Sequence, residues 1–315
     1  MQDNLVFSVV VPCFNEAEVL GEFHQRLSAI MARLDRWEVI YVNDGSTDDT
    51  LARQIALHHE DAHVVVVNLS RNFGKEVATT AGLDQVRGEA VIVIDADLQD
   101  PPELIPELVE GWRQGFDTVY AQRRTRTGES WLKIFTARMF YRVMQTFTGV
   151  TLPPNTGDFR LMSRRVVTAL QELPEHHRFM KGLFAWVGYP SKAVLYDRAP
   201  RFAGKTSWSY WKLWSLALEG ITSFTTTPLK LATYIGLIIS TVAGLYGLWI
   251  MGKTIVFGSD LPGYPSLMVV VLFMGGAQLV FLGIIGEYLG RIFNETKRRP
   301  LYFVERILRK GEEEP

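Results

Sequence analysis

The first part of the chain, up to residue 207, alternates between short apolar runs and segments whose apolar positions recur at helical spacing. The apolar runs are rich in Val and Ile, and each ends in a turn or a polar loop. With their loops they occupy residues 7–15, 37–50, 62–70 and 89–97, and the helical segments occupy 16–34, 48–60 and 75–86. Nearly continuous apolar strands separated by helices predict an α/β fold with a mostly parallel central sheet covered on both faces.

The hydrophobic pattern changes in the C-terminal part of the chain. Residues 232–251 and 266–286 contain no charged residue, and about 20 apolar residues are enough for a helix to cross the hydrocarbon core of a membrane. The short connector between them contains Pro and Gly, so we expect a hairpin of two transmembrane helices. The alternative is a hairpin in the core of a soluble protein, but soluble chains rarely contain two adjacent uncharged segments of this length.

Lys and Arg residues around this hairpin predict its orientation. The connector carries only Lys253, whereas the second apolar segment is followed by Arg291, Lys297, Arg298, Arg299, Arg306, Arg309 and Lys310. Basic loops are retained on the cytoplasmic side of a membrane. We therefore expect both ends of the hairpin, and everything that precedes it, to be cytoplasmic.

Residues 208–230 have an intermediate pattern. The stretch "WSYWKLW" holds four aromatic residues, with Lys212 inside it and Glu219 shortly after. This favours an amphipathic helix lying in the membrane interface, with a helix packed on the main domain as the alternative. The predicted organisation is an α/β domain, an interfacial region, a transmembrane hairpin and a basic tail, at residues 1–207, 208–230, 231–290 and 291–315.

Composition and charge narrow the class of protein. Hydrophobic residues make up 47% of the chain, and the mean hydropathy is slightly positive, as expected for a protein with membrane segments. The net charge of −1 gives no indication of a nucleic-acid partner. Cys13 is the one cysteine, which excludes an intrachain disulfide and a cysteine metal cluster, and we expect it to be a small buried residue. The N-terminus has no basic region followed by an apolar core, so we expect no cleaved signal peptide.

Acidic residues gather where the predicted strands stop. Parallel sheets of this kind bind ligands beyond the carboxyl ends of their strands, and that is where the sequence has Glu16, Glu18, Asp44, Asp95 and Asp97. Alternation along an extended chain would direct Asp95, Asp97 and Gln99 to one side. Two carboxylates and an amide oxygen suit Mg²⁺ or Mn²⁺, and this segment has no His or Cys for zinc. Alternatively, Asp95 pairs with an arginine of the fold and only Asp97 meets the metal.

Several common active-site motifs are missing from the sequence. No G-x-G-x-x-G follows the first predicted strand and no G-x-x-x-x-G-K-[ST] occurs, which disfavours a dinucleotide dehydrogenase and a P-loop kinase. No G-x-S-x-G nucleophile elbow occurs either. The acidic strand ends therefore need a different explanation.

Four motifs, in order, carry a resemblance to a known family. The stretches "VVVPCFNEAE", "VIYVNDGSTDDT", "NLSRNFGKEVATTAGL" and "VIDADLQDPPE" resemble the signatures of inverting family 2 glycosyltransferases of the GT-A fold. More narrowly, they resemble the polyprenyl-phosphate glycosyltransferases, which include dolichol-phosphate mannose synthases and bactoprenol glucosyltransferases. The later stretches "GDFRLMSRR" and "RFAGKTSWSYWKLW", and the pair of membrane segments, are similar to this narrower group as well.

The resemblance implies a role for individual residues on the donor side. The donor nucleotide-sugar is expected to meet Pro12, Asn15, Glu16, Asp44, Lys75 and Asp95. The metal and the donor diphosphate are expected at Asp95, Asp97 and Gln99. The same resemblance puts Asp158 at the sugar-transfer centre with Arg160 beside it, and makes Asp97 part of the catalytic set.

On the acceptor side the resemblance implies a basic site for a lipid phosphate. The matching residues are Arg123, Arg126, Arg201, Lys205 and Ser207. For each basic residue among them, ordinary surface charge is the alternative interpretation.

The activity implied by the resemblance is transfer of one sugar from a nucleotide-sugar, first of all UDP-glucose, to undecaprenyl phosphate, for modification of a cell-envelope glycan. The enzyme would sit in a bacterial inner membrane, and a homo-oligomer would be in keeping with the family. The Q-x-x-R-W motif of processive synthases is absent; the nearest stretch, "RLDRW" at 33–37, looks like a helix end. Alternatives are another UDP-sugar or GDP-mannose, a neutral lipid hydroxyl as acceptor, or a nucleotide-regulated transport component. The last is disfavoured because neither apolar segment carries an ionisable residue at mid-depth.

Overall fold

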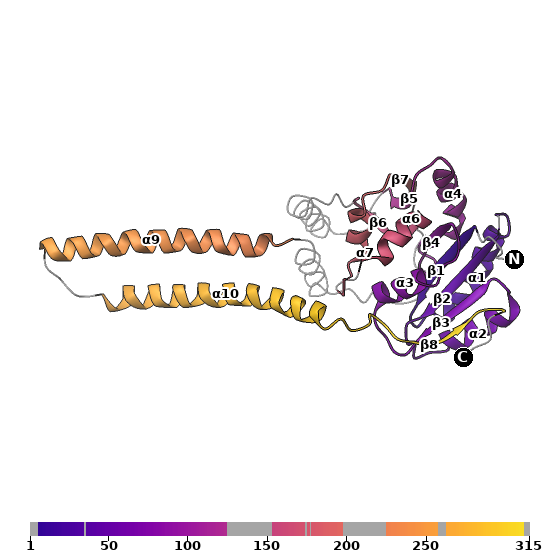
Figure 1. Ribbon diagram of the computed structural model, residues 1–315, viewed down its shortest axis with the longest axis horizontal. Helices are drawn as coiled ribbons and strands as arrows, with labels where there is room; N and C mark the ends of the chain where they lie inside the picture. Colours follow the sequence, from indigo (N-terminus) through magenta and orange to yellow (C-terminus); the bar gives the residue numbers. More distant parts are fainter. Residues whose placement is uncertain are drawn as a thin grey trace. The chain divides into compact units, whose positions relative to one another are not determined.

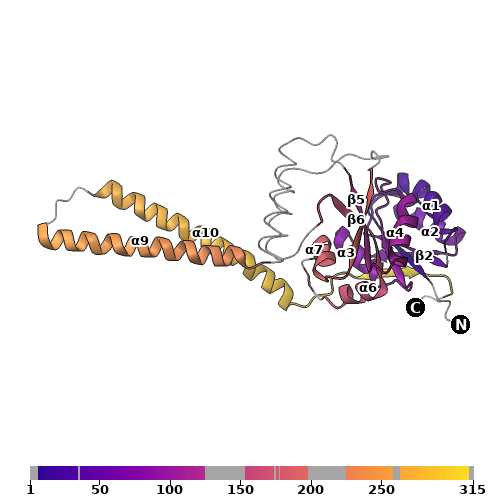
Figure 2. The ribbon, with the colours of Figure 1, turned by 90° about the horizontal axis from the view of Figure 1, so that it is seen from above.

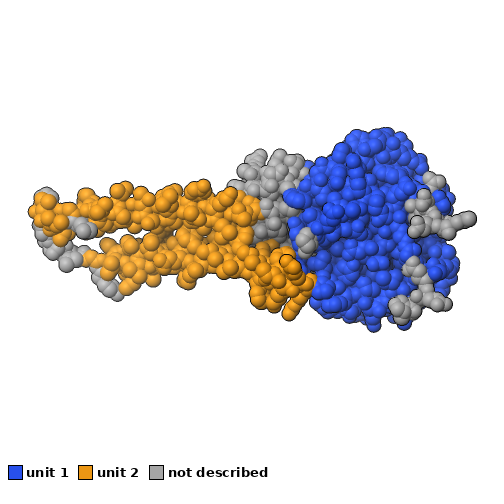
Figure 3. Space-filling view, viewed as in Figure 1, with its two compact units in different colours: residues 1–217, 300–315 blue, residues 218–299 orange. Residues whose placement is uncertain are grey.

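The computed structural model of the protein consists of two compact units. One contains residues 1–217 and 300–315, and the other contains residues 218–299 (Figure 3). The residues that the structure describes are 6–34, 36–124, 153–173, 175–176, 178–197, 225–257 and 263–311.

The first unit is built on an eight-stranded sheet in the order β7-β5-β6-β4-β1-β2-β3-β8 (Figure 1). The strands are β1 (Phe7–Cys13), β2 (Trp37–Asn43), β3 (Val64–Leu69), β4 (Ala90–Val93), β5 (Thr118–Arg123), β6 (Thr156–Ser163), β7 (Ser191–Tyr196) and β8 (Val304–Leu308). β1 is parallel to β2 and β4, β2 is parallel to β3, and β5 is parallel to β7. β6 is antiparallel to β4 and β5, and β8 is antiparallel to β3. The predicted mostly parallel α/β sheet is confirmed.

Helices cover both faces of this sheet (Figure 2). In the first unit they are α1 (Ala17–Met31), α2 (Thr50–Glu60), α3 (Lys75–Leu83), the short 3₁₀ helix η1 (Pro102–Leu104), α4 (Ile105–Arg113), α6 (Arg164–Gln171) and α7 (Met180–Trp186). Figure 2 shows α1, α2 and α4 on one side of the sheet and α3, α6 and α7 on the other.

Alternation along the central strands explains why both faces are apolar. Val9 and Val11 of β1 belong to the core that also contains Leu20 and Phe23 of α1. Val10, which points to the opposite face, packs against α3, where a Cβ on Gly82 would lie only 2.4 Å from its Cγ1. All residues of β1, β2, β3 and β4 are buried, as expected for strands with helices on both sides. Cys13 is buried, as predicted.

The chain returns to this sheet after the hairpin. β8 pairs with β3 through Val66–Leu308 and Val67–Ile307, and Nη1 of Arg309 lies 2.6 Å from Oε2 of Glu38, with both side chains buried. The segment predicted as a basic tail, residues 291–315, thus includes a strand of the sheet. The free edge of β3 offers unpaired backbone groups, which a following strand can satisfy. The strand was not predicted from the sequence, because the charged residues within it interrupt the apolar pattern of a strand.

The second unit contains two long helices, α9 (Thr227–Phe257) and α10 (Tyr264–Thr296). Their 31 and 33 residues correspond to about 46 and 50 Å of helix. The predicted segment 232–251 lies within α9, and the predicted segment 266–286 lies within α10. By length and composition each could cross a membrane, and no residue of the most apolar windows is buried in the protein. A hairpin buried in the core of a soluble domain would not expose these side chains. Residues 208–224, most of the predicted interfacial region, lie outside the described residues.

Candidate active site

The loop that follows β2 is tied to the loop that follows β3 by Asp44. Its Oδ1 accepts a hydrogen bond from the backbone N–H of Phe73 at 2.7 Å, and its Oδ2 accepts one from Gly74 at 3.0 Å. Burial raises the pKa of Asp44, although these two bonds oppose the shift. Gly45 has a φ of +63°, and a Cβ there would lie 2.4 Å from the backbone of Arg71. Only glycine allows the two loops to approach this closely.

The loop that follows β1 is joined to the same region by Asn15, which has a φ of +57°. The backbone N–H of Asn15 donates to Oγ of Ser46 at 3.1 Å, and its Oδ1 accepts from the backbone N–H of Thr47 at 2.8 Å. The N–H of Glu16 donates to Oγ1 of Thr50 at 2.8 Å. Pro12 lies one residue before the end of β1, beside Val42. Three strand ends thus form one polar rim, held together mainly by hydrogen bonds from backbone N–H groups to side-chain oxygens.

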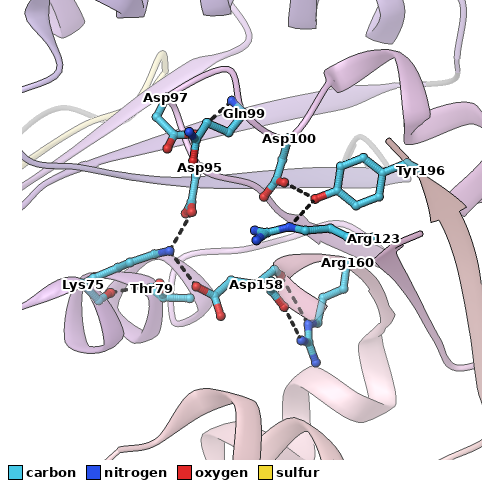
Figure 4. Close-up of polar contacts among 11 residues, drawn as sticks. Lys75, Thr79, Asp95, Asp97, Gln99, Asp100, Arg123, Asp158, Arg160 and Tyr196 are labelled. Carbon is cyan, nitrogen blue, oxygen red and sulfur yellow. Dashed lines mark hydrogen bonds and ion pairs between the residues drawn. The ribbon is translucent and has the colours of Figure 1, made fainter. Parts of the chain in front are cut away.

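Next to this rim lies a cluster of charges centred on Lys75, the first residue of α3. Its Nζ lies 2.7 Å from Oδ2 of Asp95, beyond β4, and 2.6 Å from Oδ2 of Asp158 in β6 (Figure 4). Among the described residues, the cationic partner of Asp95 is therefore a lysine. The other carboxylate oxygens, Oδ1 of Asp95 and of Asp158, are buried without a hydrogen-bond partner in the described structure. Such acceptors are costly unless something positive or a donor reaches them.

The two carboxyl groups of this cluster differ in their titration. Burial opposes ionisation of Asp158, but the charges of Lys75 and Lys181 outweigh it and hold the pKa of Asp158 below its usual value. For Asp95 burial dominates and raises the pKa, against the pull of Lys75. Burial and the charge of Asp158 raise the pKa of Glu76 to about 7. Asp158 is thus an ionised group already paired with a lysine, which makes it a weak proton acceptor.

The segment after β4 does not continue as an extended strand. β4 ends at Val93, and Leu98 has a φ of +57°, so the chain turns. Oδ1 of Asp97 accepts a hydrogen bond from the backbone N–H of Gln99 at 3.1 Å, which closes the turn. Strand alternation was therefore the wrong reason to expect Asp97 and Gln99 together. Figure 4 nevertheless shows both side chains on the side of the cluster where Asp95 lies.

A third group of side chains lies beside Asp95 and Asp158 (Figure 4). Arg123 is the last residue of β5, and its Nε donates to the hydroxyl of Tyr196 at 3.3 Å. The Tyr196 hydroxyl in turn donates to Oδ1 of Asp100, which is almost fully buried. The sequence analysis assigned no role to Asp100 or to Tyr196. No local pattern marks Tyr196, because the pairing of β7 with β5 is what brings it to Arg123.

Comparison with known proteins decides the family. The profile described as Glycosyl transferase family 2 matches residues 8–170, and the one described as GtrB C-terminal hairpin matches residues 227–292. The chain is a family 2 glycosyltransferase. The expected fold class, family and enzyme class are thereby confirmed.

Relatives of this transferase are similar over almost their whole length. A glycosyltransferase of Synechocystis sp. is 57% identical, with 94% of each chain covered. The prophage bactoprenol glucosyl transferase homolog of Escherichia coli K12 is 48% identical over 95% of this chain and 98% of the relative. The bactoprenol glucosyl transferase of Shigella phage SfV is 48% identical over 95% and 97%. Among solved structures, glucosyl-3-phosphoglycerate synthase from Mycobacterium tuberculosis is 26% identical, with a TM-score of 0.49 and 70% and 79% of the two chains covered.

In this transferase the guanidinium of Arg160 bonds to backbone oxygens and not to the carboxylate of Asp158. Its guanidinium donates to the backbone carbonyl oxygens of Asp158, at 3.2 Å, and Gly157, at 2.9 Å. It also lies over the ring of Phe184, 3.7 Å from the centroid. The residue is almost fully buried. In the described structure Arg160 therefore supports the backbone that carries Asp158.

Four of the predicted acceptor residues belong to segments that are not described. Arg126, Arg201, Lys205 and Ser207 lie outside the described residues. Of the predicted basic acceptor residues, only Arg123 is described, and it lies beside the charged cluster (Figure 4). The sequence-predicted donor residues and Asp158 all lie at the same edge of the sheet, beyond or at the ends of β1, β2, β4 and β6 and at the start of α3.

Proposed function

We propose that this glycosyltransferase transfers a single glucose from UDP-glucose to undecaprenyl phosphate, with inversion at the anomeric carbon, and so supplies a lipid-linked sugar for modification of a cell-envelope glycan. The observation that carries the proposal is the similarity, at 47–48% identity, to several relatives named bactoprenol glucosyl transferase. This similarity extends over 95% of the chain, so it includes both the sheet and the apolar hairpin. With the sheet binding a water-soluble donor and the hairpin lying in the membrane, one enzyme would reach both the donor and a membrane-bound acceptor.

The backbone-built rim beyond β1 and β2 is the donor site in this proposal. Asn15, Glu16 and Asp44, with Pro12 beneath them, would hold the nucleobase and ribose. Because Asp44 and Asn15 are already engaged by backbone N–H groups, the shape of this pocket is set before the donor arrives. A preformed pocket lowers the entropic cost of binding.

The residues beyond β4 suit a divalent metal ion, and we assign them to Mg²⁺ or Mn²⁺. Asp95, Asp97 and Gln99 offer hard oxygen ligands, and the buried Oδ1 of Asp95 has no partner in the described structure. In the described part of the chain no group of three or more His, Cys, Asp or Glu residues is arranged to hold a metal. The remaining ligands would therefore come from the donor diphosphate and water, as is common for Mg²⁺. When bound, such an ion would stabilise the charge that develops on the departing diphosphate.

The acceptor chemistry fits an enzyme without a strong base. The second ionisation of a phosphate monoester lies near pH 6, so the attacking oxygen is already largely an anion at neutral pH. In the transfer, this oxygen forms a bond to the anomeric carbon while the bond from that carbon to the diphosphate oxygen breaks, and UDP leaves. Asp158, ionised and paired with Lys75, would orient the sugar and Lys75. Arg123, with Arg126, Arg201, Lys205 and Ser207, would hold the lipid phosphate.

We further propose that the hairpin spans the inner membrane of a bacterium with the catalytic unit in the cytoplasm. Strands on both sides of the hairpin in the sequence, β7 and β8, belong to one sheet, so the chain must enter and leave the membrane on the same side. A tag before residue 5 and a tag after residue 315 should both be protected in intact cells. A cysteine introduced at Ser259, in the connector, should react with an impermeant reagent from outside. Labelling of either terminal tag from outside would refute this topology.

The decisive experiment is a panel of radiolabelled donors and lipid acceptors with the purified full-length enzyme. We expect UDP-glucose and undecaprenyl phosphate to give a lipid product that is labile to mild acid. Preference for another UDP-sugar or for GDP-mannose would overturn the donor assignment alone. Transfer to diacylglycerol or ceramide in place of the phosphate would overturn the acceptor assignment. Absence of transfer with every pair would favour a transport component.

A further inference from the structure

The side chains of Arg123 and Tyr196 are brought together by the register of two parallel strands. Arg123 and Tyr196 are the last residues of β5 and β7, and they are direct partners in the pairing of these strands. The backbone N–H of Arg124 also donates to the carbonyl oxygen of Tyr196 at 3.1 Å, which fixes the end of the ladder. Paired residues of neighbouring strands project from the same face of a sheet. The Nε of Arg123 accordingly reaches the Tyr196 hydroxyl, at 3.3 Å.

Asp100 completes this arrangement from a different part of the chain. It follows the turn after β4, is 2% exposed, and accepts the hydroxyl proton of Tyr196 in a hydrogen bond. A buried carboxylate is costly unless it is hydrogen-bonded. Burial and the neighbouring Asp100 charge raise the pKa of Tyr196 to about 12. The phenol therefore keeps its proton near neutral pH, donates it toward Asp100 and accepts from Arg123.

The outer end of Arg123 lies against the strand that carries Asp158. A Cβ on Gly157 would be 3.5 Å from Oδ2 of Asp100 and 3.6 Å from Nη2 of Arg123. These are ordinary van der Waals distances, so both side chains lie next to Gly157, the residue that precedes Asp158. Figure 4 shows the guanidinium extending from Tyr196 toward the region between Asp95 and Asp158. The Nε edge of the arginine is engaged, and the two terminal nitrogens are directed toward the charged cluster.

We infer that Tyr196 and Asp100 are positioning residues that hold Arg123 in the orientation in which its terminal nitrogens bind the phosphate of the lipid acceptor. This inference rests on the proposed function, which assigns Arg123 to the acceptor. A guanidinium binds phosphate best through two parallel N–H bonds, and this requires a fixed plane. An arginine side chain otherwise loses much rotamer freedom on binding. Engaging Nε through Tyr196 removes part of that cost before the acceptor arrives.

A purely structural role is the competing explanation, because the same bonds also fasten the edge strand β7 to the sheet. The two roles differ in what they do to the kinetics. Loss of a structural bond lowers stability and acts on both substrates alike. Loss of a positioning bond acts on the acceptor alone, and acts only while Arg123 is present.

The test is a double-mutant cycle between Tyr196→Phe and Arg123→Ala, with UDP-glucose and undecaprenyl phosphate as substrates of the full-length enzyme. We expect Tyr196→Phe to raise the apparent KM for undecaprenyl phosphate about tenfold, as for loss of a hydrogen bond to a charged group, with the KM for UDP-glucose unchanged. Arg123→Ala should raise the same constant further. The double variant should be no worse than Arg123→Ala, because Tyr196 acts through the arginine.

Tyr302→Phe is the matched control. Tyr302 donates to Oδ2 of Asp84 at 2.6 Å, so this variant loses a tyrosine–aspartate bond of the same kind that does not involve Arg123. It should leave both Michaelis constants unchanged. Asp100→Asn keeps an acceptor oxygen for Tyr196 and removes only the charge, so it should give a smaller rise for the acceptor; it serves as the second variant if Tyr196→Phe folds poorly.

The outcomes separate this inference from the proposed function. If Arg123→Ala leaves the acceptor constant unchanged, the assignment of Arg123 to the acceptor is wrong, and the inference is lost with it. If Arg123→Ala has its effect but Tyr196→Phe and Asp100→Asn do not, the positioning role alone is overturned. Multiplying effects in the double variant, or an equal effect of Tyr302→Phe, would also overturn it.

Discussion

The predicted site residues that the structure describes lie along one edge of the sheet. The two halves of this edge are held together by different kinds of contact. Beyond β1, β2 and β3, side-chain oxygens accept bonds from backbone N–H groups, as Asp44 does from Phe73 and Gly74. Beyond β4, β5 and β6 the central contacts join ionisable side chains, as between Lys75 and Asp158. The first half belongs to parallel strands that follow one another in the sequence, whereas the second includes antiparallel pairs and the edge strand β7.

This difference indicates a division of work between the halves. A rim fixed by backbone bonds has one shape, which suits a nucleotide of constant shape. Charged side chains can exchange partners when a ligand of opposite charge arrives, which suits a centre where a phosphate and a diphosphate must approach each other. The variants below either break this distinction or sharpen it.

The largest effect is expected where the two halves meet at the metal site. Asp97→Asn removes one ligand charge with almost no change in volume, so turnover should fall about a hundredfold, as for loss of metal assistance. EDTA should abolish transfer by the wild type, and Mg²⁺ or Mn²⁺ should restore it. Glu110→Gln, the same chemical change on the exposed surface of α4, should have no effect. Full activity in EDTA would exclude a metal at Asp95 and Asp97.

A smaller loss is expected from Asp158→Asn in the charged half. The variant loses the charge that pairs with Lys75, so turnover should fall about thirtyfold, as for a weakened hydrogen bond between charged groups. Because the pKa of Asp158 is lowered, the wild-type side chain stays ionised at every pH above the ordinary pKa of an aspartate. The contribution of its charge is lost only as the pH falls below that ordinary pKa. An acidic limb near pH 6 should belong to the acceptor phosphate and persist in the variant.

The measurement for Asp158 is a pH–rate profile of both enzymes at saturating donor. If the wild type shows an acidic limb that disappears in Asp158→Asn, this residue is a general base and the account of the acceptor is wrong.

In the backbone-built half, Asp44→Asn should act on the donor alone. The new NH₂ group cannot accept the bond from Phe73 or from Gly74, so the loop is held less well. We expect the KM for UDP-glucose to rise about tenfold, the usual size of one lost hydrogen bond at a buried group. The KM for the lipid should stay constant. Asp61→Asn, which precedes β3 at the opposite edge of the sheet, is the control. An equal rise for both substrates would contradict the division between the halves.

The smallest effect is expected at the strand that returns after the hairpin. Oε2 of Glu305 in β8 accepts from Nδ2 of Asn68 at 2.7 Å, and Oδ1 of Asn68 accepts from Nδ2 of Asn43, also at 2.7 Å. Glu305→Ala should lower the free energy of unfolding by about 1 kcal/mol, since the bond is partly exposed. The KM for UDP-glucose should change less than about twofold, which corresponds to about 0.4 kcal/mol of binding free energy, because the lost bond acts on stability and not on the donor. Glu110→Ala on the surface of α4 is the control. A larger rise of the KM for UDP-glucose in Glu305→Ala than in this control would show that side-chain contacts, as well as backbone bonds, shape the half of the edge beyond β1, β2 and β3.

Local patterns were enough to predict much of this enzyme. The apolar runs gave the positions of β1, β2 and β3, because strands buried on both faces are apolar at almost every residue. The acidic residues at their ends could be placed at one edge, because parallel strands share a carboxyl end. The uncharged segments at 232–251 and 266–286 predicted the two long helices on length and composition alone.

Other features could be decided only by the tertiary structure. Lys75 became the partner of Asp95 and Asp158 because α3 begins beside the ends of β4 and β6, although these residues are 20 and 83 positions apart in the sequence. Tyr196 reached Arg123 through the register of β5 and β7. β8 joined β3 across the whole hairpin, without an apolar signature of its own. Sequence periodicity reports how each segment meets water and the core, whereas contacts between distant segments depend on the strand order that the folded sheet adopts.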